Sequence, residues 1–140
     1  YEIARFDHRF ERGLSEVTAT YTLMPDGTVR VENRGCKHKK PYDVCKTAEG
    51  RAKIPDPSQP GKLKVSFFLS FYSDYYVLEL DQDEYNYALI GSSSDKYLWI
   101  LSRAPILPEE IKKKLLDAAT RWGYDVKKLI WVEQREKKIM

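Results

Sequence analysis

The sequence lacks several features that would assign it to a common class of protein. None of its apolar runs approaches the ~18 residues that a membrane-spanning helix needs. Neither sign of charge dominates, because 24 Lys and Arg stand against 21 Asp and Glu. That balance is not the charge profile of a nucleic-acid-binding protein, so we expect no nucleic-acid partner. The 2 His residues have no Ser or Cys partner at a recognisable spacing, so no nucleophilic centre is predicted and no cofactor is implied.

Cysteine is also scarce, and its two positions have two interpretations. Cys36 and Cys45 flank the basic loop 37–44. Together with His38 they would offer three metal ligands on one loop and no fourth, which is a weak indication of a metal site. If the flanking strands pair in sequence, the two Cys lie nearly opposite one another, at a separation that a disulfide can span. We therefore predict a disulfide, which is typical of an oxidising compartment.

The sequence is rich in aromatic residues. A length of 140 residues suits a single domain over 1–140 with room for a real core. Aromatic residues make up 13% of it, with 10 Tyr and 3 Trp. This is more flat, rigid surface than a small core usually needs, and it favours either a lined cavity or a binding face.

Apolar and polar residues alternate in short segments that are separated by turn formers such as Asp26-Gly27. These segments predict strands at 1–6, 15–23, 29–34, 46–54, 62–69, 75–80, 85–90 and 97–101, with a last short strand at 126–132. At 108–122 the period becomes that of an amphipathic helix, with Pro108 at its start and Gly123 after its end. The short connections favour an all-β fold, an eight-stranded antiparallel up-and-down β-barrel with one C-terminal α-helix packed outside.

The interior of such a barrel either fills with side chains or holds one small ligand. Ala48 and Ala52 lie on the face assigned to the interior, and their small size leaves volume unfilled. Asn33 places an amide on the same face, where it is either a polar contact for a ligand or bonded to a structural partner. The other candidate ligand-binding residues that alternation places inside are Tyr21, Val31, Phe67, Tyr97 and Trp99.

Arg103 shares the parity of Trp99, at the end of an inward-facing aromatic row. One interpretation is a rim arginine whose guanidinium reaches water. The other is a buried guanidinium, which needs a hydrogen-bond acceptor or an aromatic plane against it.

Three separated motifs and the helix resemble the lipocalin family, in particular the branch of bacterial lipocalins and apolipoprotein D. YEIARF resembles the strand that follows the family's Gly-x-Trp signature, DEYNYALI the second signature and YLWILSRAP the third. PEEIKKKLLDAATRWGYDVKKLIWV resembles the family's helix and closing strand. The resemblance covers essentially the whole chain. The Gly-x-Trp itself would precede Tyr1, so we expect the first strand to be incomplete and any targeting segment to lie upstream.

The resemblance implies a carrier that is not an enzyme, binding or transporting a small hydrophobic ligand such as a fatty acid or a lysophospholipid inside the barrel. It adds Tyr75 and Val77 to the inner face, where alternation alone is ambiguous, and it gives Arg103 a structural role against the signature Trp. The alternative is a lipocalin-fold enzyme acting on a bound hydrophobic substrate. Such an enzyme would need a reactive Cys or a pair of carboxyl groups inside, whereas both Cys map to a loop at the rim.

The resemblance also implies a location. Bacterial members of this branch are typically outer-membrane lipoproteins. We therefore expect the periplasmic face of the outer membrane, or secretion, with membrane anchoring through a lipid-modified N-terminal Cys upstream of Tyr1. We expect a monomer or a weak dimer.

Overall fold

A computed structural model describes residues 1–8, 11–38, 41–68 and 71–134, apart from the side chains of Phe67, Phe68, Phe71 and Tyr72. Its strands are β1 (Glu2–Phe6), β2 (Ser15–Leu23), β3 (Val29–Lys37), β4 (Val44–Lys53), β5 (Lys62–Phe68), β6 (Phe71–Leu80), β7 (Tyr87–Gly91), β8 (Trp99–Ser102) and β9 (Leu129–Trp131). Within these residues they form one 9-stranded sheet in the order β2-β3-β4-β5-β6-β7-β8-β1-β9, with every neighbouring pair antiparallel.

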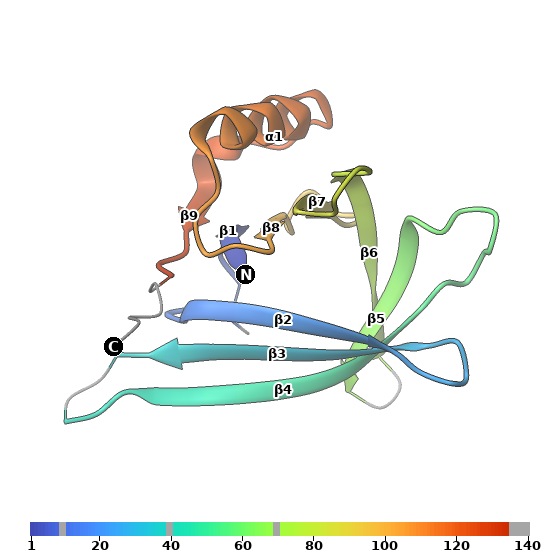
Figure 1. The fold of residues 1–140 in the computed structure, drawn as a ribbon, viewed down its shortest axis with the longest axis horizontal. Helices are drawn as coiled ribbons and strands as arrows, with labels where there is room; N and C mark the ends of the chain where they lie inside the picture. The colour runs from blue at the N-terminus through green and yellow to red at the C-terminus, as the bar shows by residue number, and fades with distance from the viewer. Residues whose placement is uncertain (9–10, 39–40, 69–70, 135–140) are drawn as a thin grey trace.

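The sheet curls so that β2, β3 and β4 lie opposite β1 and β8, and helix α1 (Glu109–Arg121) lies outside (Figure 1). Pro108 precedes the helix, Glu109 and Glu110 occupy its first turn, and Gly123 follows its end at φ +94. The predicted barrel with one external helix is therefore confirmed.

Some element boundaries differ from the prediction. β3 and β4 extend beyond their predicted limits to Lys37 and from Val44, because the two Cys continue the ladder as direct partners. The segment predicted as a strand from 126 begins instead as the short 3-10 helix η1 (Val126–Lys128), where the Asp125 carboxylate accepts from the Lys127 amide at 3.2 Å. The predicted strand at 62–69 ends at Phe68, and residue 69 lies outside the described residues.

The main apolar core lies between the helix and the outer face of β1, β7 and β8. Leu115, Ala118 and Ala119 come from the buried stripe of α1. Buried side chains from the rest of the chain complete this core: Ile3, Ala4, Phe6, Leu89, Leu98, Ile100, Leu107, Tyr124 and Leu129. The helix thus supports one side of the barrel and leaves the inner face of the sheet to other contacts.

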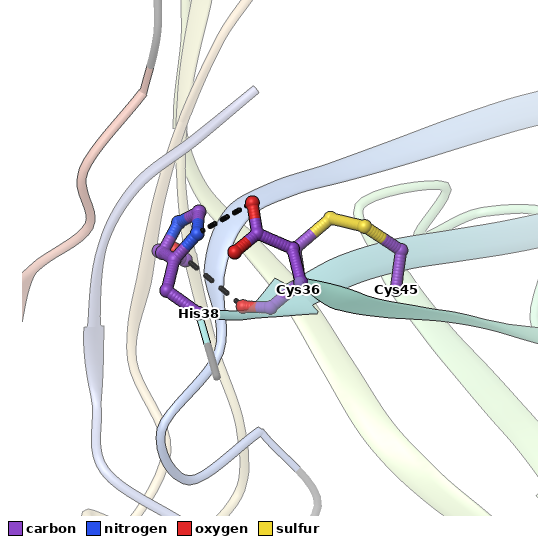
Figure 2. The surroundings of a disulfide bond; sticks show 5 residues. Cys36, His38 and Cys45 are labelled. Carbon is purple, nitrogen blue, oxygen red and sulfur yellow. Dashed lines mark hydrogen bonds and ion pairs between the residues drawn. A yellow bond between two sulfur atoms is a disulfide. The ribbon is translucent and has the colours of Figure 1, made fainter. Parts of the chain in front are cut away.

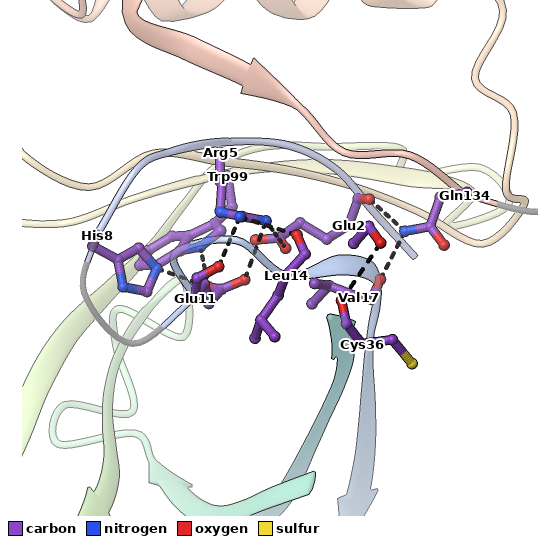
Figure 3. A network of polar contacts seen from close by, with 10 residues as sticks. Glu2, Arg5, His8, Glu11, Leu14, Val17, Cys36, Trp99 and Gln134 are labelled. Carbon is purple, nitrogen blue, oxygen red and sulfur yellow. Dashed lines mark hydrogen bonds and ion pairs between the residues drawn. The ribbon is translucent and has the colours of Figure 1, made fainter. Parts of the chain in front are cut away.

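The seam between β1 and β2 is closed by the chain that follows β9. In the described parts of the sequence no ladder joins these two strands. The Glu16 amide donates to the Glu133 carbonyl at 2.7 Å. The Gln134 Nε2 amide donates to the Glu2 carbonyl at 2.7 Å and to the Val17 carbonyl at 2.8 Å, so one side chain bridges β1 to β2 (Figure 3).

The disulfide between Cys36 and Cys45 is confirmed (Figure 2). The two residues face one another across the β3–β4 ladder, with Cα atoms 4.0 Å apart. His38 lies beside the bridge, with its Nδ1 3.0 Å from Asp43 Oδ2. Because both sulfur atoms are used in the bridge, they are not available as thiolate ligands for the alternative metal site.

Reduction of this disulfide should lower stability, because the unfolded chain regains the freedom of the loop that the bridge closes. In the chain-entropy account, a loop of this length contributes roughly 2–3 kcal/mol. Urea unfolding of oxidised and reduced protein measures the difference, and intact-mass measurement reports the state of the thiols. Equal midpoints for the two forms would contradict the expectation.

The packing between helix and sheet predicts a steric effect at Gly91. A Cβ atom there would lie 2.5 Å from Tyr124 Oη and 2.8 Å from Leu78 Cδ1. We expect Gly91→Ala to lower the free energy of unfolding by about 1–3 kcal/mol, as overpacking of a core usually does. Gly61→Ala is the matched control, since the nearest atom to its Cβ would be 3.7 Å away. Urea midpoints should fall for the first variant and stay near wild type for the second.

Candidate ligand-binding site

A hydrogen bond between two tyrosines crosses the interior of the barrel. Tyr21 on β2 and Tyr75 on β6 have their hydroxyl oxygens 2.8 Å apart. Three strands separate β2 from β6 in the sheet order. Side chains so far apart along a sheet meet only when the sheet curls and both point to its concave side. This contact therefore places both rings inside the barrel.

The aromatic contacts continue from Tyr75 to the opposite wall. The Tyr75 ring stacks on Trp99 at 6.5 Å between centroids and 24° between planes. Trp99 stacks in turn on Tyr97 at 5.9 Å and 14°, and His8 meets both of these rings edge-on at 5.8 Å. Offset stacking of this kind stabilises rigid apolar surfaces. Tyr21, Tyr75, Trp99 and Tyr97 thus form one connected row, which we call the aromatic wall.

The Tyr21 end of the aromatic wall is accessible to solvent. The Tyr21 side chain is 45% exposed, yet burial raises the pKa of its hydroxyl, and the bond from Tyr75 opposes that rise only in part. Burial also raises the pKa of Tyr75 well above its usual value, with a further contribution from Tyr21. The Tyr21 ring therefore has a solvent-accessible face, while its hydroxyl lies against Tyr75.

Aliphatic residues complete the inner face beside the aromatic wall. Val31, Ala52 and Val65 form a buried group, and Val29, Leu63 and Tyr75 pack against it. Val31 is one of the predicted ligand-binding residues, and its cross-strand partner on β2 is Tyr21. The apolar group and the aromatic wall are therefore continuous through Tyr21 and Tyr75.

The structure brings four of the eight predicted ligand-binding residues into direct contact and places most of the others nearby. Val77 is half-buried and pairs with Ile90, whose other partner is Trp99. Asn33 is half-buried between Ala19 and Ala48 in the ladder. The backbone of Phe67 lies in β5, but its side chain is outside the described residues.

Arg103 lies apart from the aromatic wall. Its side chain is exposed, and its Nε–H donates to the Tyr85 carbonyl at 2.8 Å. The exposure of this side chain agrees with the rim interpretation, and the guanidinium also has a backbone acceptor. Its stacking on a signature Trp stays a prediction.

Sequence reasoning missed a buried polar network on the inner side of β1. Glu2 is 3% exposed and Arg5 is 2% exposed. Arg5 Nη1 lies 3.4 Å from Glu2 Oε2 and 3.9 Å from Glu11 Oε2. His8 Nε2 lies 2.8 Å from Glu11 Oε1, and the Trp99 indole N–H donates to the same oxygen at 3.1 Å (Figure 3). The network thus joins β1 to the aromatic wall.

The two carboxyl groups of this network have opposite pKa shifts. Burial raises the pKa of Glu2 to about 10, the nearby Glu11 carboxyl adds to the rise, and Arg5 opposes it. Burial also disfavours the charged form of Glu11, but its contacts with His8, Glu2 and Trp99 outweigh that effect and lower its pKa to about 2. At neutral pH, Glu2 therefore holds a proton and Glu11 carries a charge that balances Arg5.

A signal for this network was present in the sequence. Arg5 interrupts the otherwise apolar run from Ile3 to Phe6, which is unusual for a strand with a buried outer face. Strict alternation would put Glu2 and Arg5 on opposite faces. A register shift between Glu2 and Ala4 in the β1–β8 ladder allows both side chains to point inward, and alternation cannot foresee such a bulge.

The network bears on the enzyme alternative, because it is a pair of carboxyl groups inside the barrel. Glu2 is 3% exposed and lies against Arg5, so this pair is engaged in contacts within the protein. Both Cys form the disulfide, so neither supplies a thiol nucleophile.

Comparison with known proteins agrees with this architecture. A family model described as a lipocalin-like domain matches residues 1–134. The chain belongs to the lipocalin family. Among its relatives, the outer membrane lipoprotein Blc of Escherichia coli (strain K12) is 49% identical over 134 residues, covering 96% of this chain and 74% of that protein. Apolipoprotein D of Mus musculus is 34% identical over 142 residues, covering 96% and 72%.

Solved lipocalin structures share the fold. Apocrustacyanin A1 from lobster superposes with a TM-score of 0.70 at 19% identity, covering 97% of this lipocalin and 76% of that chain. The resemblance that the sequence motifs indicated, to bacterial lipocalins and apolipoprotein D, is thus confirmed. Within the described residues, no helix of this lipocalin is long and apolar enough to cross a membrane.

The polar network predicts a characteristic pH dependence. Because the pKa of Glu2 is about 10 in the folded state and near 4.5 otherwise, stability should fall as pH rises from about 4.5 toward 10. The pKa of Glu11 is about 2 in the folded state, so its contribution should be lost only as pH falls from about 4.5 toward 2. Glu2→Gln keeps a neutral side chain at this position. We expect its free energy of unfolding to vary less than that of wild type between about pH 5 and 9, and to exceed it by on the order of 2 kcal/mol near pH 9.

Glu11→Gln is the contrasting variant. It removes the charge that balances Arg5, and we expect it to cost on the order of 2 kcal/mol at neutral pH. Urea unfolding of wild type and both variants at several pH values measures these effects. Parallel curves for wild type and Glu2→Gln across the range would show that Glu2 does not hold the extra proton.

Proposed function

We propose that this lipocalin binds and carries a small hydrophobic molecule with an acyl chain, such as a fatty acid or a lysophospholipid, inside the barrel. The observation that carries the proposal is the aromatic wall, which is rigid, lies on the concave side and keeps 45% of Tyr21 exposed. An apolar lining with few polar groups is the composition expected of a ligand site. Asn33 and the two tyrosine hydroxyls are the polar groups that would meet a headgroup.

The affinity follows from the buried length of the acyl chain. Each methylene removed from water contributes roughly 0.8 kcal/mol, so about ten of them contribute on the order of 8 kcal/mol before costs. Lost translational freedom and ordering of the acyl chain subtract several kcal/mol, and polar contacts and aromatic packing restore part of this. We expect dissociation constants in the micromolar range or somewhat tighter.

We also propose a location at the periplasmic face of the outer membrane, attached through a lipid anchor. The proposal is supported by the relatives that are named outer membrane lipoproteins. The Cys36–Cys45 disulfide is consistent with an oxidising compartment. We propose that the protein acts there as a monomer or a weak dimer.

The carrier proposal predicts that tryptophan emission reports the ligand. Trp99 belongs to the aromatic wall, whereas Trp122 and Trp131 are 58% and 48% exposed on the outside. Titration of delipidated protein with a long-chain fatty acid and with a lysophospholipid should saturate near one ligand per barrel. The signal should largely vanish in Trp99→Phe and persist in the matched control Trp131→Phe. If neither lipid binds below about 100 µM and neither raises the melting temperature, the carrier proposal fails.

A further inference from the structure

The buried polar network touches the aromatic wall at one point. The Trp99 indole N–H donates to Glu11 Oε1 at 3.1 Å, across 88 positions of sequence. An indole N–H inside an apolar lining needs an acceptor, and an ionised carboxylate is a strong one. Tyr75 and Tyr97 stack on the same ring. Trp99 is thus held by its faces and by its N–H, and only the N–H contact depends on a charged residue.

Glu11 is itself held from two directions. Arg5 Nη2 donates to the Glu11 carbonyl at 2.8 Å and to the Leu14 carbonyl at 3.1 Å, so the guanidinium fixes the main chain that carries Glu11. His8 Nε2 lies 2.8 Å from Glu11 Oε1 and restrains the carboxylate from the other side. Arg5 is also the cross-strand partner of Trp99 in the β1–β8 ladder. Arg5, which anchors Glu11, and Trp99, which Glu11 holds, are therefore neighbours in the sheet (Figure 3).

We propose that Glu11 is a positioning residue for the ligand site: its carboxylate, anchored by Arg5, holds the Trp99 indole in the orientation in which the ring lines the barrel. This inference rests on the carrier function proposed above. A ring held in its bound orientation before the ligand arrives loses little freedom on binding, which raises affinity without a direct contact. Loss of the Glu11 carboxylate leaves the indole N–H without its acceptor and the ring restrained by stacking alone.

A purely structural role for Glu11 would give a different result in a double-mutant cycle. The cycle uses wild type, Glu11→Ala, Trp99→Phe and the double variant, with displacement of a fluorescent long-chain fatty-acid analogue as the readout. We expect Glu11→Ala to weaken binding about tenfold in the wild-type background. In the Trp99→Phe background, where the ring has no N–H to position, the same change should cost under about twofold. An equal loss in both backgrounds overturns the proposal.

Two further variants separate positioning from stability. Glu11→Gln retains an oxygen that accepts from the indole, so it should recover most of the affinity that Glu11→Ala loses. If the alanine variant does not fold, Glu11→Leu, which fills similar volume without an acceptor, takes its place in the cycle. Gln134→Ala breaks contacts with Glu2 and Val17 in the same region but does not touch Trp99. We expect it to lower the unfolding midpoint while leaving the affinity within about twofold of wild type. Failure of Glu11→Gln to recover affinity counts against the proposal.

A measurement without ligand keeps this inference separate from the carrier function. In a background of Trp122→Phe and Trp131→Phe, Trp99 is the single tryptophan, since the chain has 3. Time-resolved anisotropy should then show faster local rotation of Trp99 in Glu11→Ala than with Glu11 present. If wild type binds no lipid but this difference is seen, the carrier function fails, and Glu11 orients Trp99 without serving a ligand site. If lipid binds and the rotation is unchanged, the positioning role fails alone.

Discussion

The guanidinium of Arg5 is the contact on which the inner side of the barrel depends. It carries a permanent charge at 2% exposure, so it depends on nearby acceptors and on negative charge. Its Nη1 lies against the carboxyl groups of Glu2 and Glu11, and its Nη2 donates to the carbonyls of Glu11 and Leu14, whereas its buried Nε has no acceptor among the described residues. The Arg5 side chain thus contacts both β1 and the segment from Glu11 to Leu14 that leads to β2. These contacts fix β1 and this segment relative to one another, and through Glu11 they also fix Trp99.

The two faces of the sheet are stabilised by different physics. The outer face of β1, β7 and β8 is covered by α1, and non-directional apolar packing is enough to hold it. The inner face combines a buried ionic network near β1 with stacked rings and aliphatic side chains toward β6. Directional contacts fix the rings, and Tyr21 keeps 45% of its surface exposed. An interior that must admit a ligand can be ordered in this way and still keep room for it.

A few hydrogen bonds close the barrel between β1 and β2. β1 is short and lies between β8 and β9, so its ladders do not reach β2. The bond from the Glu16 amide to Glu133 and the two bonds from Gln134 join the chain after β9 to the start of β2. A barrel edge that is joined by such contacts presents fewer open donors and acceptors to another chain.

Local sequence pattern determined the positions of most strands, the single helix with its end at Gly123, and the pairing of Cys36 with Cys45. These features depend on residues that are close in sequence. The family was indicated by short motifs. Alternation also placed Tyr21, Val31, Tyr97 and Trp99 on the inner face. Only the tertiary structure decided that Tyr21 bonds to Tyr75 and that Glu11 holds Trp99, since these contacts join residues 54 and 88 positions apart across the curl of the sheet. It also decided that Glu2 and Arg5 point inward together, because a register shift in β1 breaks the alternation from which a sequence assigns faces.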